Sequence, residues 1–399
     1  MSGRTTRGLT GWHAALGALA VALALLLAAC GGNASLPALT PSPEPAATPT
    51  APPAALTAST AGPATPAPRA PGPYRGLWLS AEELACLETA GPAWEGLRAA
   101  ADTPVGRPTL RDQDDNTDVL VLAKALVYAR TGEPEYLEGV LGALRAVTFE
   151  RSEEGGRVLA LGRNLVGYVL AADLVNLPAQ DPALDGAFRQ RLRELRAKRL
   201  RGKTLVGVHE QRPNNWGTHA GASRLAVALY LEEQAEVERA AQVFRGWLGD
   251  REAYDGFVFG ELWWQADPRR PVAVNPPGAR IRGISVDGAL PEEMRRGGPF
   301  RWPPEETGYP WEALQGALVQ ANLLARAGYP AWAWEEQALL RAVRFLYAIG
   351  WPAVGDDEWQ VWLVNAVYGT TFPATTPARP GKNVGWTDWT HARRCAHGP

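Results

Sequence analysis

The residues best suited to chemistry in this chain lie in one short segment, residues 212–222. Two asparagines, Asn214 and Asn215, stand there together, and His219 follows four residues after the second. If a helix begins by Asn215, its amide and the imidazole of His219 share one helix face. Such a pair can bind a carboxylate or move a proton. The alternative is that one asparagine only caps the helix, which is a common role for this residue.

The residues around this pair predict that another surface approaches the helix closely. Pro213 and Gly217 mark a loop that enters a helix of small residues. Imidazoles are scarce, because the chain has five histidines and His13 lies in the apparent leader. His219 is therefore one of few groups available for acid–base chemistry near pH 7.

A second segment, residues 265–301, holds seven arginines against four acidic residues in a chain of net charge −2. It has little helical periodicity, and Trp263, Trp264 and Trp302 flank it. Guanidinium groups bind carboxylates in a forked geometry, and aromatic rings offer flat faces to sugars. We therefore expect contacts with an acidic polysaccharide, with Trp264 and Arg301 among them. The alternative for any tryptophan here is a place in the core.

Helices must position these residues, because period-two alternation is scarce and apolar residues recur at helical spacing. Ser80 and Glu83 form a capping-box pattern before a periodic stretch that reaches about Ala101. Further helices are predicted over 119–130, 134–147, 159–175, 183–200, 217–233, 236–248, 311–327 and 331–349. Antiparallel helix pairs with short Gly/Pro loops fit an all-α bundle, a solenoid or an α/α toroid.

Three parts make up the predicted domain organisation. Residues 1–29 read as a signal peptide, with Arg4 and Arg7 before an uncharged apolar run. The stretch 27–30, Leu-Ala-Ala-Cys, resembles a bacterial lipobox, so we expect lipidation at Cys30 and anchoring to a membrane. Residues 30–73 are rich in Pro, Ala and Thr and predict a disordered tether. Residues 74–399 form the folded body, which is exported and faces outward, either periplasmic or extracellular.

Composition excludes several classes of protein. A pI near 6.3 argues against a nucleic-acid partner. Three cysteines are too few for a disulfide scaffold, although Cys86 and Cys395 could pair in an exported protein. The acidic run 112–118 lacks the glycine and terminal glutamate of a calcium loop, and we interpret it as a solvated, helix-initiating segment. We expect no cofactor, no metal and a monomer.

The body resembles the alginate lyase family, whose members cleave poly-mannuronate. The resemblance rests on the paired asparagines that open a small-residue helix and on the run 287–297, DGALPEEMRRG. It continues into Tyr309, which leads the next helix, and covers roughly residues 84–349. It implies an incomplete α/α toroid and a site in which Asn215 contacts the substrate carboxylate, Arg296 supports it and Tyr309 transfers protons. Asn214 and Trp216 would line the substrate-binding site.

The implied reaction is β-elimination, in which the C5 proton of a uronate is removed and the 4-O-linked group leaves. Hydrogen-bond donors must first neutralise the C6 carboxylate, since charge develops there in the transition state. Two features depart from the family pattern. Trp216 stands where the family usually has histidine, and His219 is our substitute for it; a Pro/Trp-rich insert also separates Arg296 from Tyr309.

Alternatives remain at this point. Tyr254 and Tyr329 are the rival tyrosines. The body could instead be a surface lipoprotein that binds acidic glycan without turnover. It could also be a glycoside hydrolase, since α/α toroids host such enzymes and these use two carboxylates. The carboxylates available for that role are Asp173, Asp287, Glu292 and Glu305.

Overall fold

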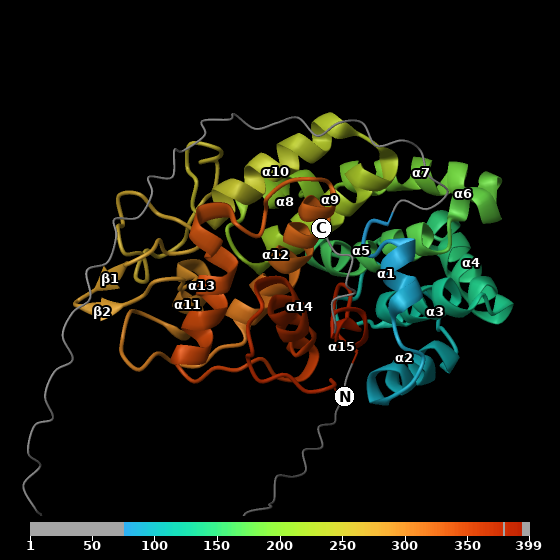
Figure 1. The fold of residues 1–399 in the computed structure, drawn as a ribbon. Helices are drawn as coiled ribbons and strands as arrows, with labels where there is room; N and C mark the ends of the chain where they lie inside the picture. The colour runs from blue at the N-terminus through green and yellow to red at the C-terminus, as the bar shows by residue number, and fades with distance from the viewer. Residues whose placement is uncertain (1–75, 378–379, 393–399) are drawn as a thin grey trace, which may run out of the picture. The chain divides into compact units, whose positions relative to one another are not determined.

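The computed structural model describes residues 76–377 and 380–392 of the chain (Figure 1). The predicted signal peptide, the lipidation site Cys30 and the tether lie outside the described residues. Among the described residues, the regular secondary structure is almost all helical, which confirms the all-α expectation.

The helices in chain order are α1 (Ala81–Cys86), α2 (Pro92–Asp102), α3 (Thr117–Thr131), α4 (Pro134–Phe149), α5 (Val158–Leu174), α6 (Leu177–Gln180), α7 (Pro182–Ala197), α8 (Leu205–Gln211), α9 (Asn215–Leu231), α10 (Gln234–Leu248), α11 (Pro291–Met294), α12 (Tyr309–Arg326), α13 (Trp334–Ala348), α14 (Trp359–Tyr368) and α15 (Thr387–Thr390). Two short 3₁₀ turns, η1 (Arg295–Gly297) and η2 (Gly355–Asp357), precede α12 and α14. Strands β1 (Arg280–Ile281) and β2 (Ile284–Ser285) pair antiparallel.

Local sequence explains most helix boundaries. The predicted capping box is present at α1, where the Ser80 hydroxyl accepts from the Glu83 amide and the Glu83 carboxylate accepts from the Ser80 amide. The single helix expected from here to Ala101 is wrong, because α1 ends at Cys86, where Leu87 is extended. The next helix begins at Pro92, after Gly91, whose φ of 89° favours glycine. At the C-terminal end of α3, Gly132 adopts the left-handed conformation that stops a helix.

Burial divides the helices into two kinds. All residues of α5 are buried, and α3, α9 and α12 are buried over most of their surface. In contrast, α2, α7 and α10 bury one face and expose the other. Because a helix that is buried all round must lie inside other helices, α3, α5, α9 and α12 form an inner set that α2, α7 and α10 cover.

The inner helices pack very closely where the sequence places glycine. A Cβ on Gly162 of α5 would lie 2.9 Å from the backbone nitrogen of Ala220 in α9. A Cβ on Gly316 of α12 would lie 2.4 Å from the carbonyl carbon of Thr218. Backbones at this separation leave no room for side chains, so the predicted close approach to the small-residue helix is confirmed on both of these sides of α9.

Helix contacts form a closed circuit through the described residues. They run from α2 to α3, α5, α9, α12, α14 and α15, and from α15 back to α2. Figure 1 shows α15, in red, beside the blue-green α2 and α3. Two indole N–H groups form hydrogen bonds between the C-terminal and N-terminal segments. Trp386 donates to the carbonyl of Val119 at 3.0 Å, and Trp389 donates to that of Glu88 at 2.8 Å.

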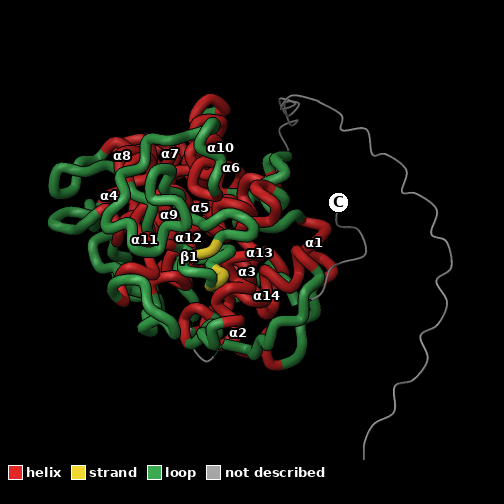
Figure 2. The backbone as a smooth tube through the Cα atoms, turned by 90° about the vertical axis from the view of Figure 1, so that its left-hand side faces the viewer, coloured by secondary structure: helices red, strands yellow, loops and turns green. Residues whose placement is uncertain are grey.

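The long segment between α10 and α12 contains the strands, α11 and otherwise loops and turns (Figure 2). The predicted lack of helical periodicity over residues 265–301 is therefore confirmed, apart from α11 and η1. The β1–β2 pair joins Arg280 to Ser285 and Ile281 to Ile284. This segment lies against the N-terminal ends of α9 and α12, because α11 contacts α12 and the backbone of Asn215.

Candidate functional site

The first turn of α9 places both asparagines. Asn214 is the N-cap, and its side-chain oxygen accepts from the amide of Trp216 at 3.2 Å. The capping interpretation therefore holds for Asn214. Asn215 is the first helical residue and is buried, and its backbone N–H donates to the carboxyl of Glu293. Asn215 is thus fixed from two directions, by its own helix and by α11.

Glu293 lies on the short helix α11. This helix begins at Pro291, and Pro is well suited to the first turn of a helix. The side chain is 1% exposed. Burial raises the pKa of Glu293 to about 8, although the Asn215 N–H and the charge of Arg296 act in the opposite direction. The carboxyl is therefore mostly protonated at pH 7. The sequence motif contained this residue, but nothing in the sequence indicated that it would contact Asn215, 78 residues away.

Arg296 and Tyr309 meet in spite of the insert between them. The guanidinium carbon of Arg296 lies 3.9 Å from the centroid of the Tyr309 ring, which is a close cation–π contact. Tyr309 is the first residue of α12 and is 36% exposed, and Arg296 is also exposed. The Pro/Trp-rich insert between η1 and α12 therefore separates the two residues in sequence only.

His219 reaches the same region from α9 but stays below the surface. Its ring is 0% exposed, and Nε2 lies 3.8 Å from a carboxylate oxygen of Glu312. Burial lowers the pKa of His219, and the charge of Arg163 adds to this, whereas Glu312 and Asn383 oppose it. The ring has no surface at which substrate could touch it, so its partner in this structure is Glu312.

Glu312 is a residue that the sequence analysis missed. It lies one helical turn after Tyr309 and is 26% exposed. Arg163 from α5 pairs with it at 3.1 Å. Burial alone would raise the pKa of Glu312, but contact with His219 and the charge of Arg163 hold it below its ordinary value. Glu312 is therefore an anion in the cluster, and only its tertiary contacts reveal it.

The remaining predicted contact residues differ in their exposure and in their partners. The Trp216 ring is partly buried, with the Arg212 guanidinium 5.7 Å from its centroid. Arg301 is exposed and pairs with Glu305 at 2.5 Å. Trp264 is 1% exposed, donates to the carbonyl of Gly298 and belongs to the core. A ring without a free face cannot stack on a sugar, so the core alternative applies to Trp264; its neighbour Trp263, and also Trp302, are exposed instead.

The rival tyrosines are engaged elsewhere. The Tyr254 hydroxyl donates to the carbonyl of Glu210 at 2.5 Å, beside α8. The Tyr329 hydroxyl accepts from the Gln234 side chain, and its ring packs against Trp334, in agreement with its interpretation as a packing residue. Neither contact joins the cluster around Asn215, so Tyr309 stays the preferred tyrosine.

The four carboxylates considered for a hydrolase all have hydrogen-bond or ion-pair partners within the protein. Asp173 accepts from the backbone N–H of Leu77 at 2.7 Å. Asp287 accepts from the N–H of Gly278 and from Arg341. Glu292 accepts from Gly260 and Arg295, and Glu305 pairs with Arg301.

The acidic run 112–118 differs from its prediction at one end. Asp118 is buried in the first turn of α3, and burial raises its pKa to about 7. Lys382, also buried, donates to the carbonyl of Asp115 from the C-terminal segment. The run thus begins a helix as expected, but Asp118 is not solvated. Among the described residues, no group of three or more His, Cys, Asp or Glu is placed to hold a metal.

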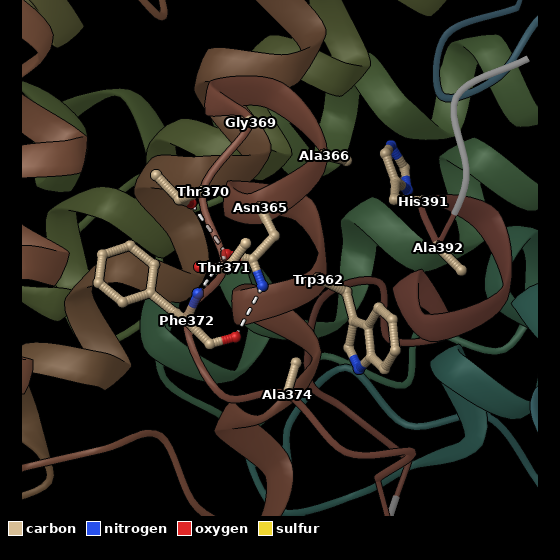
Figure 3. Close-up of a pocket in the computed structure, with 10 residues that line it drawn as sticks. All are labelled: Trp362, Asn365, Ala366, Gly369, Thr370, Thr371, Phe372, Ala374, His391 and Ala392. Carbon is tan, nitrogen blue, oxygen red and sulfur yellow. Dashed lines mark hydrogen bonds between the residues drawn. The ribbon is translucent and has the colours of Figure 1, made fainter.

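Two pockets lie outside the Asn215 cluster. One, of about 560 Å³, is lined by α14, the following turn and His391 (Figure 3). The Asn365 side chain in its wall is already engaged, since it accepts from the Thr370 hydroxyl and from the Phe372 backbone N–H. The other, of about 200 Å³, is basic, and Arg212, which also covers Trp216, lines it together with Lys203.

Comparison with known proteins finds no family model, no curated relative and no solved structure that matches this chain. Within the part of the chain that the structure describes, no helix has the length and apolar character needed to cross a membrane.

Proposed function

We propose that this protein is a polysaccharide lyase that cleaves an acidic, uronate-containing glycan such as alginate by β-elimination. The observation that carries the proposal is the close contact between Arg296 and Tyr309, at 3.9 Å, beside a first turn of α9 that is fixed by Glu293. A cation that can bind a carboxylate and a phenol that can transfer a proton are thus adjacent, and Glu293, three residues before Arg296, joins this segment to the first turn of α9. Asn215 and Glu293, which join the two segments, are 78 residues apart in sequence.

Each residue has a defined task in the proposed reaction. Arg296 and the Asn215 amide bind the C6 carboxylate and stabilise the charge that develops on it as the C5 proton leaves. Tyr309, in its phenolate form, takes the proton from C5, and the phenol so formed donates that proton to the departing 4-oxygen. The pair of Glu312 with Arg163 and the buried His219 hold the first turn of α12, and therefore Tyr309, against α9.

The surroundings favour a long anionic substrate. Trp263 and Trp302 are exposed and flank the arginine-rich segment in sequence. Arg212 contacts the Trp216 ring and also lines the small basic pocket. Aromatic faces and cations suit uronate chains. We further propose that the closed circuit of helix contacts is an incomplete α/α toroid, with the site at the N-terminal ends of inner helices α9 and α12.

The cellular setting is also a proposal. The lipobox-like cysteine at Cys30 and the Pro/Ala/Thr-rich stretch after it support an exported protein anchored to a membrane by lipid. Such an anchor holds the body on the periplasmic or cell-surface side, where polysaccharides are encountered.

Product chemistry tests the proposal. Purified protein is incubated with polyuronates, and the ultraviolet absorbance of the unsaturated product is followed. Rising absorbance supports the lyase. Rising reducing ends without absorbance favour hydrolysis, and binding without either favours a glycan-binding lipoprotein. Tyr309→Phe should abolish the absorbance but leave binding intact, with Tyr254→Phe as the matched control.

A further inference from the structure

The two consecutive glutamates of α11 hold different parts of the protein. Glu292 accepts from the N–H of Gly260 at 3.1 Å and from the Arg295 guanidinium, so it ties the preceding loop to η1. Glu293 turns the other way and accepts the N–H of Asn215. One oxygen of Glu293 therefore contacts the helix turn that carries the proposed carboxylate ligand.

The other oxygen, Oε2, is buried and has no hydrogen-bond partner among the described residues. A buried ionised carboxylate normally uses both oxygens, because an unpaired buried charge is costly. The charged groups that face Glu293 are Arg296 from η1, Glu292 on its own helix and Glu312 from α12. Two of these three are negative, so the surroundings disfavour a further negative charge.

We propose that Glu293 is a positioning residue of the Asn215–Arg296 site, that it acts as a neutral carboxylic acid, and that its ionisation weakens uronate binding. The inference rests on the proposed function, since it concerns the same carboxylate site. A neutral carboxyl accepts the Asn215 N–H and leaves Arg296 free for the substrate. An ionised one adds a buried negative charge that attracts Arg296 and repels the substrate carboxylate.

The pKa of Glu293 sets the pH range in which uronate binding should weaken. Burial raises the pKa of Glu293 to about 8. At pH 9 only about one tenth of the molecules keep the proton, so affinity for a uronate chain should fall about tenfold between pH 7 and pH 9. The loss should appear in Kd and KM and not in kcat. A purely structural role for Glu293 does not predict this split.

The test measures the affinity of the full-length protein for poly-mannuronate from pH 6 to pH 9 by calorimetry, with turnover followed in parallel. Glu293→Gln keeps the acceptor oxygen but cannot ionise, so its affinity should vary less than twofold across this range. Glu305→Gln is the matched control, since this exposed carboxylate is not among the charged groups that face Glu293, and the variant should keep the wild-type fall above pH 8.

Three results overturn the inference: wild-type affinity that is flat from pH 7 to pH 9, the same fall in Glu293→Gln as in wild type, or no binding of poly-mannuronate at any pH. The wild-type measurement decides even if Glu293→Gln does not fold. Binding with the expected pH dependence but without turnover supports the role of Glu293 and refutes the lyase, so the two failures are distinguishable.

Discussion

The close contact of α9 and α12 makes Gly316 the most sensitive position for testing the fold. A Cβ there would lie 2.4 Å from the carbonyl carbon of Thr218 and 2.5 Å from the backbone nitrogen of His219. Both of these are backbone atoms of a buried helix, so neither can rotate away. Gly316→Ala must therefore separate α12 from α9, and with them Tyr309 from Asn215.

The cost is the balance of two effects. Alanine in a helix is favoured over glycine by about 1 kcal/mol. Overpacking of a tight core costs about 1–3 kcal/mol, and a clash with fixed backbone belongs at the upper end. We expect Gly316→Ala to lower the free energy of unfolding by about 2 kcal/mol. Gly142→Ala in α4 is the control, because its Cβ meets nothing within 4 Å and should raise stability by up to about 1 kcal/mol.

Urea denaturation followed by circular dichroism measures both variants. The free energies of unfolding of Gly316→Ala and Gly142→Ala should differ by about 3 kcal/mol, with Gly316→Ala the less stable variant. If Gly316→Ala equals or exceeds the wild type in stability, the packing of α9 on α12 described above is wrong. Poly-mannuronate turnover should also fall in this variant and stay unchanged in the Gly142 control.

Three further predictions concern titration, redox state and charge. The folded-state pKa of Glu293 is raised from 4.5 to about 8, so native protein binds the extra proton and loses stability as pH rises through this window. The free energy of unfolding of Glu293→Gln, relative to that of wild type, should therefore rise by about 1.4 kcal/mol per pH unit from pH 5 to pH 8 in denaturation curves. A difference that stays constant with pH would contradict the burial of that carboxyl. Cys86 is disulfide-bonded. We predict that Cys395 is its partner; mass analysis with and without reductant should identify this pair, and two free thiols would exclude it. Arg296→Ala should lower kcat/KM about 100-fold, as removal of a charge-stabilising donor does, while the paired and exposed Arg301→Ala should raise KM only, and equal effects would remove Arg296 from the centre of the site.

Helices were largely predictable from sequence because their signal is local. Apolar periodicity located most helices, and the capping box at Ser80 placed the start of α1. Short helices were missed: α8, α14 and α15 have at most ten residues, and such lengths give little periodic signal. The division between α1 and α2 was missed because apolar spacing continues on both sides of it, although α1 ends at Cys86, where Leu87 is extended, and α2 begins only after Gly91.

The site was predictable only in part, because several of its contacts are tertiary. Asn215, Arg296 and Tyr309 were identified from their motifs, and Arg296 and Tyr309 indeed meet. No sequence pattern indicated that Glu293 would accept from the Asn215 backbone or that Glu312 would lie between Arg163 and His219. Burial is equally non-local, since nothing in the composition around Trp264 distinguishes it from exposed Trp263.

The most direct test of the central claim is the ultraviolet absorbance of products from poly-mannuronate, measured for wild type and Tyr309→Phe side by side. We predict that absorbance rises with wild type and that Tyr309→Phe, although folded and still able to bind the glycan, produces none. Absorbance that rises equally with both proteins would contradict the role of Tyr309. No absorbance from wild type across a panel of polyuronates would contradict the lyase itself.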